Sequence, residues 1–390
     1  MIFLLVIIYI SFISLGLPDA ILGSAWPMIH LDINAQLASA GIISLIVSLG
    51  TLISGLLSSR LILKLKIGKV TLISTLLTSF ALLGFSFSNS LWQMCLLAFP
   101  LGLGAGTIDA ALNNYVSLHY KARHMNWLHS FWGVGATLGP IIMSFFLGAS
   151  QKWRSGYRII FLIQITLAII MFFSLPLWHE NQEKENKKFI SNKEAFLIKG
   201  VKFALLGFIT YCGYEQATGL WTSSYLVTIK GLNFETSALW VSLFYIGISL
   251  GRILSGFLSI KVSSLNLVRY GCMLGIIGVI FLFLPSYFCL VGLILIGLGA
   301  SPYYPQMMHE TPKRFGELSS SAVMGLQMAS ASLGVIVLPP LIGLLTNWFS
   351  LMVFPITLLI LEIIAFICNE LVTKICKKEL IENKQNEYDR

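Results

Sequence analysis

Charged residues are scarce in this sequence. Asp, Glu, Lys and Arg make up only 11% of its 390 residues, whereas 56% are hydrophobic; an ordinary soluble domain is about one quarter charged. The mean hydropathy is +0.82. A water-facing fold cannot hide so many apolar side chains. The composition therefore excludes a soluble globular protein and predicts one whose solvent is lipid.

The sequence also lacks patterns that hold metals or nucleotides. It has no H-E-x-x-H, no Walker A sequence and no C-x-x-C pair, and its histidines are scattered. Five of the six cysteines lie inside apolar runs, as small core residues do. We therefore expect no enzyme, no metal site and no cofactor, and nothing suggests the symmetric filter of a channel.

Long apolar runs recur from the first residue to about Thr373. A bilayer core about 30 Å thick needs about 20 apolar residues per helix, so twelve spans would use nearly the whole chain. The first run carries Pro18 and Asp19 and lacks a basic start, so it is a helix rather than a signal peptide. We predict an all-α membrane protein with helices near residues 2–27, 36–58, 70–88, 91–117, 126–149, 157–178, 201–228, 237–259, 267–284, 288–308, 319–346 and 350–372.

The basic residues collect in alternate loops, which explains the net charge of +9 without a nucleic-acid partner. One set of loops and the C-terminal tail hold Arg60, Lys64, Lys66, Lys69, Lys121, Arg123, Lys184, Lys187, Lys188, Lys193, Lys199, Lys261, Arg269, Lys313, Arg314, Lys374, Lys377, Lys378, Lys384 and Arg390. The other loops hold only Lys152, Arg154, Arg158 and Lys230. The positive-inside rule then predicts an inner-membrane protein with both termini in the cytoplasm. The loop that contains Lys152 runs against that rule.

The second half of the chain repeats the first. Residues 48–60 (SLGTLISGLLSSR) and 249–261 (SLGRILSGFLSIK) share seven of thirteen residues, and Gly-Leu-Gly-Ala occurs at both 102–105 and 297–300. A polar, mixed-charge stretch separates the halves. We predict a bundle of six helices at 1–179, a linker at 180–199 that can touch lipid headgroups, a second bundle at 200–373 and a tail at 374–390. Two such halves need no partner subunit to enclose a cavity near the membrane midplane.

Among the charged residues inside apolar runs, four stand out: Asp19, Asp109, Glu215 and Arg252. A charge at the bilayer centre costs at least about 2.5–3.5 kcal/mol, so such residues are seldom there without a role. Burial favours the neutral form of a carboxyl, which makes the three acids candidates for proton coupling. Arg252 is a candidate ion-pair or gating residue. The alternative for each acid is a purely structural ion pair, for instance with Arg252.

Polar and aromatic residues accompany these charges. Asp109 and Asn113 are four residues apart, hence on one helix face, where a carboxylate and an amide can grip a polyhydroxylated solute. The candidate substrate-binding set is Asp109, Asn113, His129, Trp132, Glu215, Gln216, Trp221, Tyr303 and Gln327. A histidine can relay protons or serve only in structure, and the aromatic residues can stack on a sugar ring or simply fill the core.

These runs resemble the major facilitator superfamily over the whole chain, and within it the fucose–galactose–glucose:proton symporter group. The similar segments are Leu17-Pro18-Asp19-Ala20-Ile21-Leu22, Asp109-Ala110-Ala111-Leu112-Asn113, the run from Asn126 to Gly135, Tyr211-Cys212-Gly213-Tyr214-Glu215 with Gly219-Leu220-Trp221 and Tyr225-Leu226, and Gly251-Arg252. The resemblance implies that Asp19 couples protons. The chain departs from the fucose-type pattern with Asp109 in place of glutamate and His129 in place of glutamine. The loop Ser58-Ser59-Arg60 lacks the aspartate common in the superfamily.

Together these features predict a secondary transporter, with a proton-coupled symporter of a sugar or similar small polar solute as the leading hypothesis. Asp19 would carry the proton, Asp109 and Asn113 would bind the solute, and Glu215 with the aromatic residues would line the second half of the cavity. The alternative is a proton-driven exporter of drugs or metabolites, because membrane acids serve antiport equally well.

Overall fold

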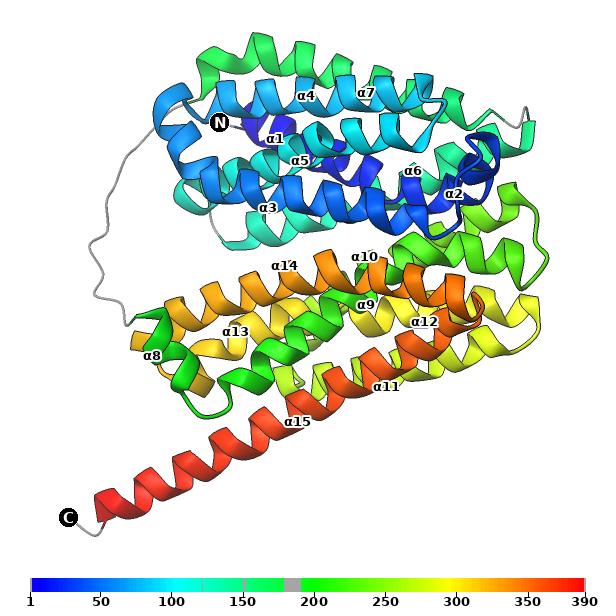
Figure 1. The fold of residues 1–390 in the computed structure, drawn as a ribbon. Helices are drawn as coiled ribbons and strands as arrows, with labels where there is room; N and C mark the ends of the chain where they lie inside the picture. The colour runs from blue at the N-terminus through cyan, green and yellow to red at the C-terminus, as the bar shows by residue number, and fades with distance from the viewer. Residues whose placement is uncertain (1, 121, 150–151, 179–190, 389–390) are drawn as a thin grey trace.

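The computed structural model describes residues 2–120, 122–149, 152–178 and 191–388, and every regular element in this part of the chain is a helix (Figure 1). The helices lie in two groups, one above the other in Figure 1, with the chain passing from the upper group to the lower between α7 and α8. The all-α fold predicted from the sequence is confirmed.

The first group begins with a broken span. Its helices are α1 (Ile2–Asp19), α2 (Ile21–Asp32), α3 (Ser39–Leu65), α4 (Ile67–Phe87), α5 (Leu91–His119), α6 (Ala122–Ala149) and α7 (Trp153–Ser174), which a 3-10 turn follows at Leu175–Leu177. The helices α1 and α2 form one span, which reaches Asp32 instead of ending near residue 27 as predicted. The break falls at Ala20, directly after Asp19.

The second group contains α8 (Asn192–Leu197), α9 (Val201–Thr228), α10 (Phe234–Leu258), α11 (Ser264–Phe283), α12 (Ser286–Ala300), α13 (Tyr303–Phe315), α14 (Glu317–Trp348) and α15 (Val353–Tyr388). The predicted span at 288–308 consists of α12 and α13, separated at Ser301 and Pro302. The predicted tail at 374–390 continues α15 as a helix to Tyr388.

Eleven segments of the described chain are long and apolar enough to cross a membrane. The one predicted span that is not among these eleven segments, at residues 201–228, is helix α9. It is 28 residues long but too polar to qualify by composition. Most of its residues are buried, among them Thr218, Thr222 and Ser224. It packs against α2, α10, α14 and α15. Because this helix contacts protein on most sides, its side chains need not be apolar. We count it as the twelfth span because of its place among the other helices.

The two groups repeat one packing plan, as the sequence repeat predicts. The contacts of α1 with α6, α3 with α5, α4 with α5 and α4 with α7 recur as α9 with α14, α10 with α12, α11 with α12 and α11 with α15. We therefore call them the first and second halves. The predicted linker at 180–199 lies mostly outside the described residues. At its end Ser191 caps α8, and its backbone N–H and hydroxyl donate to Glu194 and hold the pKa of that carboxyl below its usual range.

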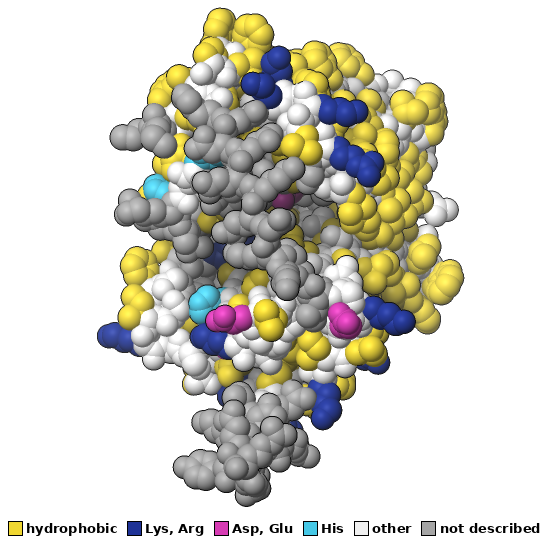
Figure 2. Space-filling view, turned by 90° about the vertical axis from the view of Figure 1, so that its left-hand side faces the viewer, with side chains coloured by type: hydrophobic (Ala, Val, Ile, Leu, Met, Phe, Trp, Pro, Cys, Tyr) yellow, Lys and Arg dark blue, Asp and Glu magenta, His cyan; other side chains and the backbone are white. Residues whose placement is uncertain are grey.

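The molecule has two chemically different ends. The linker end carries α8, the turns at Lys66 and Gly316, the loop 259–263 and the extension of α15, and Figure 2 shows Lys and Arg side chains on both halves there. The far end carries the loops 33–38, 88–90, 229–233, 284–285 and 349–352.

Two cations at the far end, Arg154 and Lys230, contact local acceptors. Arg154 belongs to the region that runs against the positive-inside rule, and its contacts give a structural reason for its charge there. Arg154 pairs with Asp32 and also donates to the Asn89 side chain at 2.9 Å. Lys230 donates to the backbone oxygen of Leu284 at 2.7 Å. These residues join neighbouring segments of one half, so their positive charge has a structural use there.

The two halves touch closely at the far end through residues with little or no side chain. A Cβ on Gly23 of α2 would overlap the carbonyl oxygen of Gly219 and lie 2.7 Å from the Leu220 Cα on α9. One turn away, Ser223 donates to the Ser24 carbonyl at 3.0 Å. A Cβ on Gly41 of α3 would lie 2.8 Å from the Cα of Pro340 on α14. Backbone against backbone thus closes this end, a contact that small residues permit.

We expect Gly23→Val to keep the halves apart at the far end, because the added carbons overlap the α9 backbone. The side chains of Gln36 and Asn347, which are hydrogen-bonded across the halves at 3.3 Å, give the readout. Both would be replaced by cysteine in a background without the six native cysteines and joined by a short bifunctional reagent. Cross-linking should fall several-fold in the variant. Gly55→Val, where a Cβ meets open space, should leave it unchanged; equal cross-linking in both would contradict the assignment.

Candidate functional site

Asp19 stands at the break in the first span and is held by Trp132. Its Oδ2 accepts a hydrogen bond from the indole Nε1 of Trp132 on α6 at 2.7 Å. Pro18 has no N–H for the Ser14 carbonyl one turn earlier, and the Nε2 of Gln164 on α7 donates to that carbonyl at 3.0 Å instead. Proline opens the helix here, a buried amide satisfies the freed carbonyl, and the carboxyl points to Trp132.

Trp132 also connects the first half to the second. The guanidinium carbon of Arg252 on α10 lies 5.3 Å from the centre of the Trp132 ring, within cation–π range. Arg252 Nη2 is 3.6 Å from the Glu215 Oε1 on α9, and the Tyr211 hydroxyl donates to the Glu215 Oε2 at 2.6 Å. We call Asp19, Trp132, Arg252, Glu215 and Tyr211 the central chain. It links four helices and crosses between the halves.

Three of the predicted residues are exposed although they lie within membrane spans: Asp19, Asp109 and, near the start of its span, His129. Asp109 acts electrostatically on Asp19, and Arg252 acts on His129, so all three belong to the bundle interior. A carboxylate facing hydrocarbon would be costly. Their exposed surface therefore borders water-accessible space between the halves.

Asp109 and Asn113 lie on one face of α5, as their spacing predicts. The Asn113 Nδ2 donates to the Asp109 Oδ1 and to the Asp109 backbone oxygen, both at 2.9 Å. The amide leaves its own oxygen, and the carboxylate its second oxygen, as acceptors for another molecule. The pair is thus a preformed group of hydrogen-bonding atoms on the first half.

A cavity of about 60 Å³ adjoins Asp19. Gln216 and Leu220 of α9 line it from the second half, and Ser44, Ser48 and Tyr157 are among the residues that line it from the first. Small-molecule sites usually occupy about 300–1,000 Å³. In this conformation the cavity has room for a few water molecules but not for a sugar, and both Gln216 and Asp19 line it.

Three other predicted substrate-binding residues are not brought to this group. Trp221 is fully buried, and its indole N–H donates to the Pro339 carbonyl at 3.0 Å. The buried side chain of Gln327 accepts from Thr311 at 2.9 Å. Tyr303 is buried and stacks on Tyr211, with ring centres 4.6 Å apart. Trp221 and Tyr303 are core residues here, which is the alternative stated for the aromatic residues, and Gln327 is also buried. Tyr303 in addition stacks on Tyr211, the last residue of the central chain.

Sequence reasoning missed two tyrosines of this site. Tyr211 lies four residues before Glu215, one turn away on the same helix face, and that spacing is a signal that could have identified it. Tyr245 on α10 meets Trp132 edge to face, with ring centres 6.3 Å apart. Nothing in the spacing of Tyr245 indicates the contact, because it depends on how the halves pack.

The described residues contain no group of three or more His, Cys, Asp or Glu side chains that could hold a metal. Residues 247–251 read Gly-Ile-Ser-Leu-Gly, which matches the nucleophile-elbow pattern of hydrolases. That pattern requires a strand-to-helix turn, whereas Ser249 lies within α10 and donates to the Tyr245 carbonyl. The site can bind a polar solute and a proton.

Comparisons with known proteins agree with this architecture. The profile of the Major Facilitator Superfamily matches residues 8–322. The chain is 25% identical over 348 residues to the glucose/mannose transporter GlcP of Bacillus subtilis, covering 86% of each chain. It is 25% identical over 270 residues to a putative glucose/galactose transporter of Helicobacter pylori, covering 64% of this chain and 65% of that one. Proteins of this kind are transporters, not enzymes.

A solved structure of a variant of the nucleoside transporter NupG superposes with a TM-score of 0.76 at 12% identity, covering 95% of this chain and 98% of that one. A bacterial homologue of the lysosomal transporter Spinster, in an inward-facing conformation, gives 0.71 at 13% identity over 95% and 96%. At these identities the likeness concerns the fold alone.

We expect Arg252→Gln to destabilise the protein by about 1–2 kcal/mol, because it leaves Glu215 without its cation. Breaking a fully buried pair costs about 3–5 kcal/mol, but these two side chains keep 20% and 19% of their surface exposed. Adding Glu215→Gln should restore part of the loss, a coupling that thermal unfolding in detergent measures as a double-mutant cycle. Lys313→Gln is the control and should change little, because the lysine side chain of the pair with Glu310 is 65% exposed. Additive losses would show that the two charges do not interact.

Proposed function

The chain belongs to the Major Facilitator Superfamily, and we propose that it is a proton-coupled symporter that takes up a sugar or a similar small polar solute by alternating access. One observation carries the proposal. Asp19, a water-accessible carboxyl in mid-membrane, accepts a hydrogen bond from the Trp132 indole N–H. The ring face of Trp132 meets Arg252, a cation of the opposite half. A change in the charge of Asp19 therefore acts on a contact between the halves.

Proton coupling follows from this chain of contacts. Ionised Asp19 is a strong acceptor for the Trp132 indole and holds the ring toward α1; protonation weakens that charge-assisted hydrogen bond. Arg252, which pairs with Glu215, then lies over an indole ring that Asp19 holds less firmly. A bound solute that replaces the lost interactions would let the loaded carrier change conformation. Coupling requires such a difference in affinity between states.

A sugar suits the candidate polar and aromatic groups of the site. Its hydroxyls need donors and acceptors, which Asp109, Asn113 and Gln216 supply, and its apolar ring face can lie on the Trp132 indole. The relatives that match most of the chain are named for glucose, mannose and galactose transport. These names support the substrate class and leave the particular sugar to experiment.

The basic residues of the linker end support an orientation in the plasma (inner) membrane with both termini in the cytoplasm. In that orientation the far end, where Gly23 and Gly41 bring the halves together, is periplasmic. The conformation described here is then closed to the outside. It corresponds to the state that releases solute inward, and we expect one copy of the chain to be sufficient for transport.

A proton-driven exporter of drugs or metabolites is the second candidate. It has one supporting observation, a 32% identity over 117 residues to the multidrug resistance protein MdtG of Dickeya zeae, which covers only 29% of this chain. The sugar transporter of Bacillus subtilis matches over a far larger share. Proteoliposomes loaded with a pH-sensitive dye distinguish the candidates, since symport acidifies the lumen with the solute and antiport removes protons from it.

We expect Asp19→Asn to abolish sugar-dependent proton uptake into proteoliposomes while sugar exchange across the membrane continues. The amide cannot release a proton, yet it keeps a hydrogen bond to Trp132. The assay offers a panel of hexoses, pentoses and deoxy-sugars. Asp32→Asn is the matched control, because it removes an aspartate of the same span at the far end, outside the central chain.

Accumulation of sugar against its gradient by Asp19→Asn would disprove coupling through this residue. Silence of the unaltered protein across the whole panel, with correct insertion verified, would reject sugar symport in favour of the exporter.

A further inference from the structure

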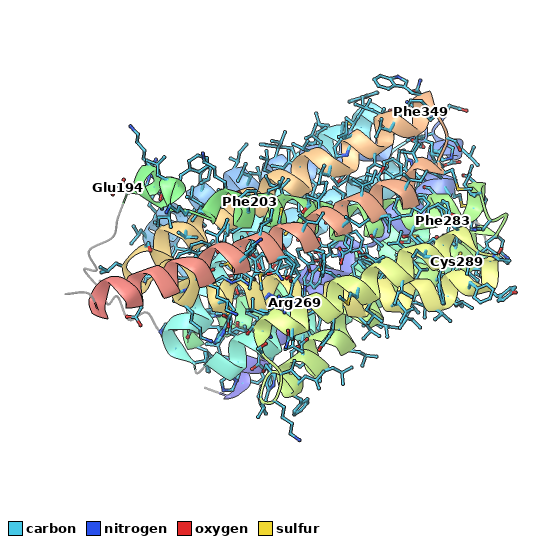
Figure 3. The ribbon with its side chains drawn as sticks, turned by 90° about the horizontal axis from the view of Figure 1, so that it is seen from below. Glu194, Phe203, Arg269, Phe283, Cys289 and Phe349 are labelled. Carbon is cyan, nitrogen blue, oxygen red and sulfur yellow. The ribbon has the colours of Figure 1, made fainter. Side chains whose placement is uncertain are left out.

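Another acidic residue lies inside the membrane, away from the central chain. Glu362 is on α15, and its side chain is 2% exposed. Figure 3 shows α15 beside α11, with Arg269 toward the linker end of α11 and Phe283 at the other end. Among the residues that the structure describes, the Oε2 of Glu362 has no hydrogen-bond partner, and neither has the hydroxyl of fully buried Tyr214 on α9. Two unpartnered polar groups in a dry interior call for a physical reason.

Both groups converge on Gly275 of α11. A Cβ on Gly275 would lie 2.8 Å from the Glu362 Oε1 and 3.2 Å from the Tyr214 hydroxyl, so glycine leaves the space they occupy. The Cys272 thiol, one turn earlier on α11, is the hydrogen-bonding neighbour of Glu362. A thiol and a phenol are neutral, and neither compensates a negative charge.

The cations near Glu362 are engaged elsewhere. Arg269 of α11 is bidentate to Glu370, with its Nε 2.5 Å from Oε1 and its Nη2 2.7 Å from Oε2. Arg314 of α13 donates to the Asn369 side chain at 3.0 Å. The remaining titratable neighbour is Tyr303 of α13. Among the described residues, an ionised Glu362 would be a buried charge without a partner, which proteins avoid by neutralising the group.

The first half offers an internal comparison. The buried residues Tyr157, Ile160, Gln164 and Leu167 of α7 have the same spacing as Pro355, Leu358, Glu362 and Ala365 of α15, and α7 and α15 occupy equivalent places in the two halves. Glu362 therefore stands where the first half has a glutamine, the neutral side chain closest in shape to a protonated glutamic acid.

Gln164 makes a closed set of hydrogen bonds. Its Oε1 accepts from Thr78 of α4 at 2.8 Å, and its Nε2 donates to the Ser14 carbonyl of α1 at 3.0 Å. Glu362 meets the equivalent helices, α11 and α9, through Cys272 and Tyr214. The first half thus fixes this junction with an amide, and the second half places a titratable acid at the same junction.

We propose that Glu362 is a second proton-binding site of this transporter, separate from the central chain and protonated in the conformation described here. The neutral acid fits between α9, α11 and α15 as Gln164 fits between α1, α4 and α7. Loss of the proton to water leaves a negative charge against Tyr214, the residue before Glu215 on α9. The charge loosens α15 and α11 from α9, so alkaline pH acts on the second half independently of Asp19.

The test compares the full-length protein with Glu362→Gln. The folded protein holds a proton here that the unfolded chain releases at neutral pH, so its ratio of folded to unfolded molecules falls up to tenfold per pH unit as pH rises, until Glu362 ionises. Glu362→Gln removes that contribution, and its thermal stability should decline less between neutral and alkaline pH. Infrared spectra should lose one carbonyl band of a neutral carboxylic acid. Uptake should remain proton-coupled, with a flatter pH profile on the alkaline side.

Gln164→Glu is the matched variant, because it places the same acid at the equivalent junction. It should gain a neutral-acid band and a steeper loss of stability with rising pH. Glu317→Gln, which removes an exposed acid at the start of α14, should change neither the neutral-acid band nor the slope. An unchanged band and slope in Glu362→Gln would overturn the proposal. Failure of Glu362→Gln to fold would also overturn it, since the neutral isostere must fit where a protonated acid fits.

Discussion

The architecture depends on the cost of leaving a charge uncompensated inside a membrane. Asp19, Arg252 and Glu215 can lie at mid-membrane only because each has a partner, and Trp132 supplies two of these interactions at once, an N–H to the carboxylate and a ring face to the guanidinium. Since the partners belong to different halves, the same contacts that make the charges tolerable also join the halves at the centre. Any step that changes one charge must be answered by a rearrangement of the others, which is the requirement for coupling a proton to movement.

The two halves solve the same packing problem with different chemistry. In the first half Pro18 frees a backbone carbonyl, and Gln164 satisfies it with a neutral amide. The corresponding helix of the second half, α9, has no proline at that point; Thr218 donates to the Tyr214 carbonyl, and the buried residue on α15 is an acid. Polar residues are frequent in α9 because protein surrounds it, and this helix carries both Glu215 of the central chain and Tyr214 beside Glu362. The duplicated scaffold is thus chemically asymmetric.

Most of the fold could be predicted from the sequence, because three independent signals are present. Apolar runs indicate the spans, loop charges indicate their orientation, and the repeat indicates the two halves. The ends of spans were less accurate: α2 reaches Asp32 because that residue pairs with Arg154, a contact distant in sequence. In the site, Asp19, Glu215 and Arg252 are charged residues, which are rare inside membrane spans, so residue type and position indicated them. The contact of Asp19 with Trp132 joins residues distant in the chain and was not predicted. Trp221, Tyr303 and Gln327 did not separate from core residues, since a buried aromatic ring or amide has the same sequence signal in either role. Glu362 has the same sequence signal as Asp19, an acid inside an apolar run, but its place beside Tyr214 and Gly275 depends on packing between segments distant in the chain.

The contact between Gly23 and the backbone of Gly219 and Leu220 has a consequence for how this chain can diverge. Each side of the far-end contact is encoded about two hundred residues from the other, yet neither can gain volume alone. Substitutions at these positions should therefore be correlated. A larger residue at Gly23 of α2 is acceptable only if the α9 backbone moves away from it, and the same holds for Gly41 and Pro340. In an alignment of relatives, such pairs should show a linked history even where the overall identity has fallen to the level of chance.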